Sequence, residues 1–209
     1  MFTGIIESIG QIKTVEALQD SDYAGVRLAV HAPTLDFSDV KLGDSIAIQG
    51  ACMTVVSMEA KTFHVDVSQE SLSKTVGLSM PGEVNLEKAM RLSDRVGGHL
   101  VSGHVDGLGR VVDFSPVGES WHLQIRAPKN LSPFFAYKGS VTVNGVSLTV
   151  NQVDDQTSGE CDIHINLIPH TVQMTTLKHL KAGSPVNLEI DQIARYCERI
   201  VKTMNLNQG

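Results

Sequence analysis

The sequence has no run of eighteen apolar residues that could span a membrane, and its first ten residues, MFTGIIESIG, lack the basic start and apolar stretch of a secretory signal peptide. We therefore expect a cytoplasmic protein with no membrane partner. Basic residues are in the minority, because 17 Lys and Arg stand against 23 Asp and Glu and leave a formal net charge of −6. No basic run is interleaved with aromatic residues to follow a phosphate backbone, so the composition argues against a nucleic-acid partner.

Cysteine is also scarce. Cys52, Cys161 and Cys197 are far apart, odd in number and free of any CxxC pair, so we expect reduced thiols and neither a disulfide framework nor a zinc site. His99 and His104 lie close together in GGHLVSGHVDGLG, but a spacing of five does not put them on one helical face, and no carboxylate cluster completes a metal site. No metal is expected, although histidines that titrate near neutral pH can act as acid or base catalysts.

What the sequence does contain is an internal repeat. The octapeptide IQGACMTV at 48–55 returns as VNGVSLTV at 143–150, and a shift of 95 positions aligns a longer stretch around each without a gap. The tetrapeptide VNLE also occurs twice, at 84–87 and at 186–189. Almost the whole chain up to Glu189 therefore consists of two copies of one unit, with a period too long for a solenoid.

Apolar and polar residues alternate with a period of two along short segments of each copy, the pattern of half-buried β-strands. Glycine-containing turns separate them, which favours an all-β fold with an antiparallel barrel or sandwich of about six strands per copy. Only short helical turns are expected inside the barrels, near Pro33 to Asp39 and after Pro128. The segments are VRLAV (26–30), SIAIQG (45–50), MTVVSM (53–58) and FHVDV (63–67), then WHLQI (121–125), SVTVNG (140–145), LTVNQV (148–153) and CDIHINL (161–167).

The tail has a helical period instead. Residues 191–206, DQIARYCERIVKTMNL, place apolar side chains at i, i+3, i+4 and i+7 spacing, and Asp191 is suited to cap the helix. A lone amphipathic helix needs either a groove on its own chain or a partner chain to bury such a stripe, and we expect the partner chain. The stripe consists of Ile193, Tyr196, Cys197, Ile200, Val201 and Met204.

The two octapeptides differ at one chemically important position, because Cys52 in the first copy corresponds to Ser147 in the second. The duplication thus retains two similar pockets with a thiol in one and a hydroxyl in the other. The alternative is a plain β-hairpin with a buried Thr, and a lone Cys in a strand is more often a small buried hydrophobe than a nucleophile. SQES (68–71) and IPHT (168–171) end equivalent strands, where they either hydrogen-bond the edge of a heterocycle or form simple turns.

Together these motifs resemble the riboflavin synthase family, whose members make riboflavin by dismutating two molecules of 6,7-dimethyl-8-ribityllumazine. The similarity covers essentially the whole chain. The resemblance implies a transferase with two six-stranded antiparallel β-barrels and a C-terminal α-helix, assembled as a homotrimer and, in some members, enclosed by lumazine synthase. The motifs that carry it are MFTGII, GACMTV, NGVSLTV, both copies of VNLE, GGHLVSGHVDG, IPHT and VNLEID.

In this family each barrel binds one lumazine, and the working site lies between the N-terminal barrel of one subunit and the C-terminal barrel of its neighbour. One lumazine donates a four-carbon unit to the other, which yields riboflavin and 5-amino-6-(ribitylamino)uracil. No cofactor is required, because donor and acceptor are the same compound. The implied domains are an N-terminal lumazine-binding barrel (1–97), a C-terminal lumazine-binding barrel (98–189) and a trimerisation helix (190–209).

The resemblance also implies site residues. The proposed catalytic residues are Cys52, Ser147, Asp191, His99 and His104. The N-terminal pocket would be formed by Gly4, Ile5, Ile6, Cys52, Met53, Thr54, Asp66, Val67, Ser68, Gln69, Glu70 and Ser71. The C-terminal pocket would be formed by Gly103, His104, Val105, Lys138, Ser147, Leu148, Thr149, Leu167, Ile168, Pro169, His170, Thr171 and Val172.

The chain departs from the family pattern in the first octapeptide and in IPHT. Gln49 replaces the usual Asn and adds a methylene beside the pocket, Met53 replaces Leu, and His170 stands where some members have a carboxylate.

Two rival functions stay open. A lumazine-binding fluorescent or antenna protein would share the fold without turnover, and a double barrel without ligand would leave the paired polar motifs without a reason. The presence of Cys52 and both histidines favours the enzyme.

Overall fold

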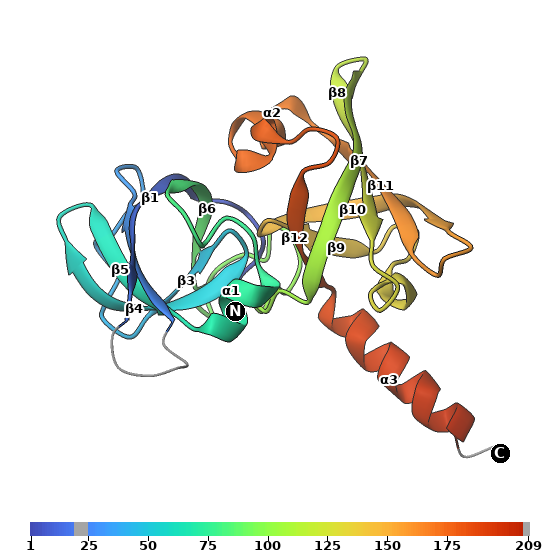
Figure 1. Cartoon of the computed structure of the whole chain (residues 1–209), viewed down its shortest axis with the longest axis horizontal. Coiled ribbons are helices and arrows are strands. Elements are labelled where there is room, and N and C mark those ends of the chain that lie inside the picture. The colour runs from blue at the N-terminus through green and yellow to red at the C-terminus, as the bar shows by residue number, and fades with distance from the viewer. Residues whose placement is uncertain (19–24, 207–209) are drawn as a thin grey trace.

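In the computed structural model, which describes residues 1–18 and 25–206, the strands form two closed antiparallel β-barrels of six strands each (Figure 1). The strand order around the first barrel is β1-β2-β5-β4-β3-β6, and the second repeats it as β7-β8-β11-β10-β9-β12. The predicted all-β fold with a terminal helix is confirmed. The strands are β1 (Ser8–Ala17), β2 (Val26–His31), β3 (Ser45–Ile48), β4 (Ala51–Glu59), β5 (Thr62–Val67) and β6 (Gly82–Lys88), then β7 (Gly107–Val117), β8 (Ser120–Ala127), β9 (Ser140–Val143), β10 (Val146–Asp155), β11 (Cys161–Leu167) and β12 (Pro185–Ile190).

Short helices follow the fifth strand of each barrel, at SQES and IPHT, for which the sequence left open either a simple turn or a contact with the edge of a heterocycle. Ser68 accepts a hydrogen bond from the Ser71 amide and caps α1, while Pro169 occupies the first turn of α2, where its missing N–H is not needed. Of the two places where short helical turns were expected, residues 33–39 contain single hydrogen-bonded turns, with the Leu35 amide donating to the Ala32 carbonyl and the Val40 amide donating to the Phe37 carbonyl, and the segment after Pro128 contains a short 3₁₀ helix, η1. The helices are α1 (Gln69–Lys74), η1 (Ser132–Phe134), α2 (Pro169–Gln173), η2 (Thr176–His179) and α3 (Gln192–Leu206).

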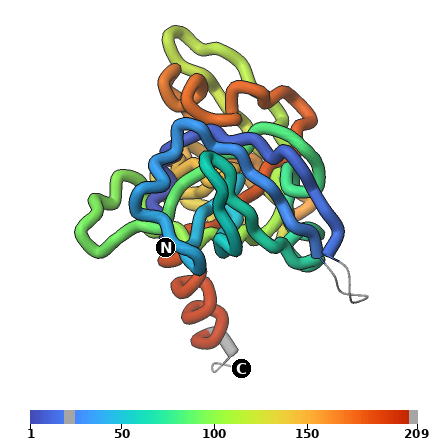
Figure 2. Tube along the Cα trace, turned by 90° about the vertical axis from the view of Figure 1, so that its left-hand side faces the viewer, coloured from blue at the N-terminus to red at the C-terminus, as the bar shows by residue number. Residues whose placement is uncertain are grey.

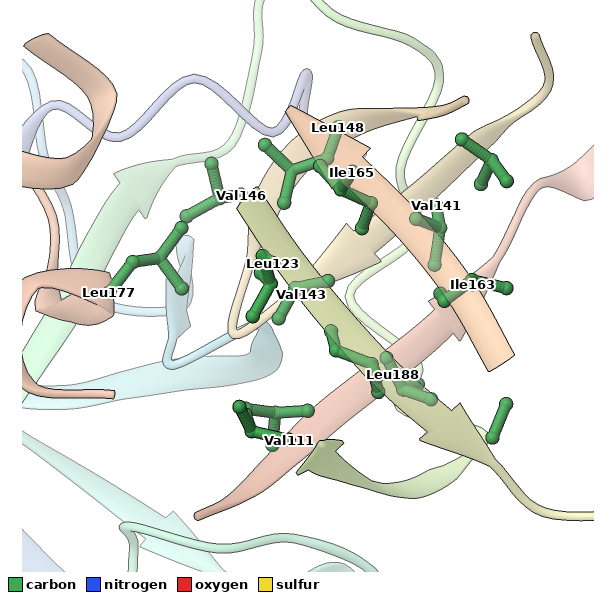
Figure 3. Packing of buried hydrophobic residues seen from close by; sticks show 14 of the residues in the cluster. Val111, Leu123, Val141, Val143, Val146, Leu148, Ile163, Ile165, Leu177 and Leu188 are labelled. Carbon is green, nitrogen blue, oxygen red and sulfur yellow. The ribbon is translucent and has the colours of Figure 1, made fainter. Parts of the chain in front are cut away.

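Alternate residues of each strand point into a barrel and form one hydrophobic core per copy. Figure 3 shows the second core, in which Leu123, Val141 and Ile163 from three different strands lie among other fully buried side chains. Equivalent strands also carry an irregularity at equivalent places, for example between Val55 and Ser57 on β4 and between Val150 and Gln152 on β10. Such bulges bend a strand and help the sheet to close on itself.

The two barrels meet at the turns that connect β3 to β4 and β9 to β10. Gln49 and Asn144 have φ angles of 51° and 50°, and Gly50 and Gly145 follow with φ angles of 88° and 84°. Successive positive φ values are those of a tight hairpin turn. A Cβ atom on Gly50 would lie 2.7 Å from the Gly145 amide nitrogen, so the two turns touch through backbone only. Glycine is therefore required here by close approach as well as by conformation.

The asparagine of each VNLE motif joins the barrels across this contact. Asn85 donates from its side chain to the Asn144 carbonyl, and Asn187 donates to the Gln49 carbonyl, both at 2.9 Å. The Gln49 side chain accepts from the Asn85 amide at 2.9 Å and contacts the Thr176 hydroxyl at 3.3 Å. The Gln49 side chain therefore lies in the buried junction between the barrels and lines neither hollow, and Asn144 makes the equivalent contact by accepting a hydrogen bond from the Asn187 amide at 2.8 Å.

The C-terminal helix α3 projects away from both barrels (Figures 1 and 2). Asp191 caps it as expected, accepting a hydrogen bond from the Ile193 amide at 2.8 Å. The predicted apolar stripe is exposed along its length, with 65% of Tyr196 and 61% of Met204 accessible, so no groove formed by residues 1–18 and 25–206 covers it. No helix within residues 1–18 and 25–206 has the length and apolar character needed to cross a bilayer.

Candidate active site

The chain segments that precede the two barrels pair with each other. Phe2 and Val101 exchange two backbone hydrogen bonds of 2.7 and 3.0 Å, and both side chains are buried together with Ala47. This pairing places each segment against the barrel of the other half of the chain. The consequence is a crossed arrangement, in which residues that precede one barrel build the pocket of its partner.

Two glycines complete the crossing. The Gly4 carbonyl accepts the Ser147 amide, and the Gly103 carbonyl accepts the Cys52 amide, each at 2.8 Å. Gly4 and Gly103 have φ angles of 76° and 79°, and a Cβ atom on either would lie within 2.7 Å of the Cβ of Ser147 or Cys52. Only glycine fits such positions. The reactive side chains of both octapeptides are thus held in the same way, each from the opposite half.

Two buried glutamates hold the segments that contain Gly4 and Gly103, which we call the glycine segments. Glu87 accepts hydrogen bonds from the amides of Thr3 and Gly4 at 2.6 and 2.9 Å and from the Thr3 hydroxyl at 2.7 Å. Glu189 accepts from the amides of Ser102 and Gly103 at 2.7 and 3.0 Å. Burial raises the pKa of both carboxyl groups, and the backbone donors oppose that rise.

The first pocket lies at the first barrel, beside Cys52. It is a hollow of about 250 Å³ between the octapeptide, helix α1 and the crossing segment. Cys52 is half-buried, His104 is exposed to the hollow, and Lys74 forms an ion pair with Glu70 at 2.8 Å on the α1 side. The lining residues are Ala51, Cys52, Met53, Glu70, Ser71, Lys74, Thr75, Gly103, His104 and Val105.

The second pocket is the counterpart at the second barrel. It is a smaller hollow of about 160 Å³, formed by the second octapeptide, helix α2 and the N-terminal segment. Where the first pocket has Lys74, this one has the apolar Met174. The lining residues are Gly4, Ile5, Ile6, Val146, Ser147, His170, Thr171, Met174 and Thr175.

Ser147 has an imidazole partner. Its hydroxyl lies 2.7 Å from Nδ1 of His99, and Nε2 of the same ring lies 3.4 Å from the Thr142 hydroxyl. Burial lowers the pKa of His99, and the negative charge of Asp191 opposes this shift. A neutral imidazole at neutral pH can accept a proton, so this pair is suited to general acid-base chemistry.

Known proteins are similar to almost the whole of this chain. The lumazine binding domain matches twice, at residues 3–89 and 102–191. Riboflavin synthase of Photobacterium phosphoreum is 43% identical, over 96% of this chain and 89% of its own, and that of Bacillus subtilis is 37% identical, over 100% of this chain and 93% of its own. The chain belongs to the riboflavin synthase family. The crystal structure of LumP complexed with 6,7-dimethyl-8-(1'-D-ribityl) lumazine has the same fold, with a TM-score of 0.75 and 25% identity over 91% of this chain and 99% of that chain.

In this riboflavin synthase family member the glycine segments line the opposite pockets from those expected. Gly4, Ile5 and Ile6 were expected at the N-terminal barrel but line the hollow beside Ser147. Gly103, His104 and Val105 were expected at the C-terminal barrel but line the hollow beside Cys52. That division is wrong within one chain, because the two segments cross before they enter their own barrels.

Other predicted residues lie outside both hollows of the single chain. Lys138 extends to the Asn151 side chain at 3.1 Å, and Asp66 forms an ion pair of 2.7 Å with Arg27, which lowers the pKa of Asp66. Val67, Leu148, Leu167 and Val172 have side chains in the barrel cores. Thr54 and Thr149 are exposed within β4 and β10, and Ser68, Gln69, Ile168 and Pro169 are exposed after the ends of β5 and β11. For the core residues, only the backbone can face a ligand.

Several residues that shape the pockets were not predicted from the sequence. Glu87 and Glu189 fix the glycine segments, and Lys74 and Met174 give the two hollows different walls. The signal for the glutamates was present, because VNLE occurs in both copies, but a repeated motif does not say which backbone groups its carboxylate binds.

Proposed function

We propose that the chain converts two molecules of 6,7-dimethyl-8-ribityllumazine into riboflavin and 5-amino-6-(ribitylamino)uracil by transferring a four-carbon unit. One observation carries the proposal: a thiol and a hydroxyl occupy equivalent places in two pockets built on one framework. A reaction between two identical molecules needs two similar binding sites, and it also needs them to treat their ligands differently. The pair Cys52 and Ser147 meets both requirements.

The residues divide into two groups in this proposal. On the second pocket, His99 accepts a proton through its contact with Ser147, and Asp191 adds negative charge near that ring. On the first pocket, Cys52 and His104 supply a nucleophile and an acid or base. The acidic 7-methyl group of one lumazine must lose a proton, and a ring carbon of the other must be attacked. Holding two rings face to face contributes a large part of the acceleration.

The working site requires two chains in this proposal. The two hollows have no lining residue in common, so two ligands bound to one chain lie in separate pockets. A pocket of one chain must therefore face a pocket of another. The exposed apolar stripe of α3 is suited to hold such an assembly, which we infer to be a cytoplasmic homotrimer.

A binding protein without turnover is the second candidate, supported by the likeness to LumP, whose structures contain 6,7-dimethyl-8-(1'-D-ribityl) lumazine or riboflavin. One experiment separates the two functions. Purified protein is mixed with the lumazine, and riboflavin formation is followed by absorbance. The enzyme should form one riboflavin for every two lumazines consumed, and a variant with Cys52→Ala and Ser147→Ala should form far less. Tight binding with no riboflavin would support the binding protein instead.

A further inference from the structure

Two glutamates stand out because they are buried without a cation. Glu87 on β6 and Glu189 on β12 are 4% and 2% exposed, and neither forms a salt bridge within residues 1–18 and 25–206. A buried carboxylate is costly unless hydrogen bonds satisfy it. Here the backbone amides of the crossing segments supply those bonds, so each segment is held by the barrel that follows it in the sequence.

We propose that Glu87 and Glu189 are positioning residues that act crosswise, each aligning the reactive side chain of the opposite barrel. Glu87 belongs to the first barrel but holds Gly4, whose carbonyl receives the Ser147 amide of the second barrel. Glu189 belongs to the second barrel but holds Gly103, whose carbonyl receives the Cys52 amide of the first. Neither carboxylate lines the hollow beside Cys52 or the hollow beside Ser147, so both act on those side chains through the backbone.

The carboxylate form is needed because both of its oxygens accept. In each case one oxygen takes the first amide and the other takes the glycine amide. Glutamine has the same size but offers only one acceptor, so one buried amide would face an NH₂ group. A glycine with positive φ has little conformational preference of its own to keep it in place. Losing one of the two bonds should therefore loosen the segment while the barrel stays folded.

The test uses the full-length protein carrying Glu87→Gln or Glu189→Gln, with amide hydrogen exchange measured by mass spectrometry in the absence of substrate. Glu87→Gln should speed exchange about tenfold in the peptide that contains Ser147, the factor that corresponds to one lost hydrogen bond to a charged group. It should leave the Cys52 peptide unchanged. Glu189→Gln should give the reverse pattern.

The three cysteines provide a second readout. Alkylation by iodoacetamide, resolved by peptide mass, should speed up several-fold at the half-buried Cys52 in Glu189→Gln but not in Glu87→Gln. Cys197 on α3 should be alkylated at the same rate in both variants and is the internal reference, and buried Cys161 stays unlabelled as long as the second barrel is folded. A merely structural role would change Cys52 and Cys161 together.

A matched control lies on the same strand as Glu87. Glu83 is partly exposed and contacts His179 at 2.7 Å, so Glu83→Gln should leave both peptides as in the native protein. An uncrossed pattern, equal changes in both peptides, or no change would overturn the proposal. The catalytic importance of the two glutamates rests on the proposed function, but amide hydrogen exchange is measured without substrate and does not depend on turnover. A native chain that makes no riboflavin yet shows the crossed pattern would refute only the proposed function. If riboflavin does form, each variant should lower kcat more than it raises KM.

Discussion

At the scale of single residues, the two pockets combine one framework with different chemistry. Cys52 corresponds to Ser147, His104 to Ile5 and Lys74 to Met174, so one hollow has a thiol, an imidazole and an ammonium group where the other has a hydroxyl and two apolar side chains. Two identical ligands in these hollows would meet different environments. This difference is what a dismutation requires, since one molecule must give up a fragment that the other accepts.

The first prediction concerns Cys52. Replacing Cys52 with Ala should lower kcat about 100-fold while changing the lumazine Kd little, because a group that acts in the transition state affects turnover more than binding. Single-turnover kinetics and a fluorescence titration measure the two quantities. The Cys161→Ala protein is the control, since that thiol is buried in the core of the second barrel and lines neither hollow, and its turnover should change little. Equal losses in kcat and affinity would mean that Cys52 only packs against the ligand.

The second prediction concerns His99 and pH. Burial lowers its pKa in the folded protein from the ordinary value of 6.5, so the unfolded chain takes up a proton first as the pH falls. His99 should therefore contribute stability that is fully present above about pH 6.5 and is lost as the pH falls through its folded-state pKa. Urea unfolding between about pH 7.5 and 5 should show a steeper decline in the free energy of unfolding for the native protein than for His99→Gln. Parallel declines would contradict a depressed pKa at His99.

At the scale of elements, alternation along the sequence located eight of the twelve strands, and β1, β6, β7 and β12 were not among the predicted segments. Segments such as VRLAV and CDIHINL lie within β2 and β11, because half the side chains of each strand enter a core and half remain outside. Helices α1 and α2 were missed, since five or six residues are too few for a helical period to emerge. The crossing of the leading segments was also missed. Strand patterning says which face is buried, but not which barrel a loop covers.

The third prediction concerns helix α3. A chain that ends at Asp191 should stay folded but sediment as a monomer, because it lacks the exposed stripe that contains Tyr196, Ile200 and Met204. It retains Asp191, so any loss of turnover does not come from removing that carboxylate. It does lose the ion pair of Arg195 with Asp106, of 2.9 Å.

A point variant separates these effects. Ile200→Lys places a charge in the stripe and leaves that ion pair intact, so it should also yield monomers. Arg199→Gln, at the neighbouring exposed position, should not. Sedimentation velocity gives the mass in each case, and a truncated chain that still sediments as an oligomer would refute the role of α3.

At the scale of the whole molecule, the two barrels form one interdependent unit. Asn85 and Asn187 each bond to a backbone carbonyl of the other copy, and Gly50 and Gly145 touch through their backbones. Buried polar groups that lose such partners destabilise a fold by about 1–3 kcal/mol each. Each copy was expected from the sequence to hold a complete pocket, and this fails for a physical reason. The strands of one pocket are consecutive in the chain, whereas its wall comes from the other half.

The last prediction follows from that dependence and concerns a fragment of residues 1–97. Alone, its Gly4 segment has no second barrel to cover, and its Cys52 amide lacks the Gly103 carbonyl. Two copies can satisfy both needs if the Gly4 segment of each covers Cys52 of the other, as Gly4 covers Ser147 in the full chain. The fragment should therefore fold as a dimer, bind one lumazine per chain and make little riboflavin, because a thiol would stand where Ser147 belongs.

Sedimentation equilibrium measures the mass of the fragment, and calorimetric titration measures the number of lumazines bound per chain. Gly4→Ala should weaken the dimer and ligand binding together, since its Cβ has no room at that crossing. A folded monomer that binds the lumazine as tightly as the dimer would show that one barrel builds its own pocket.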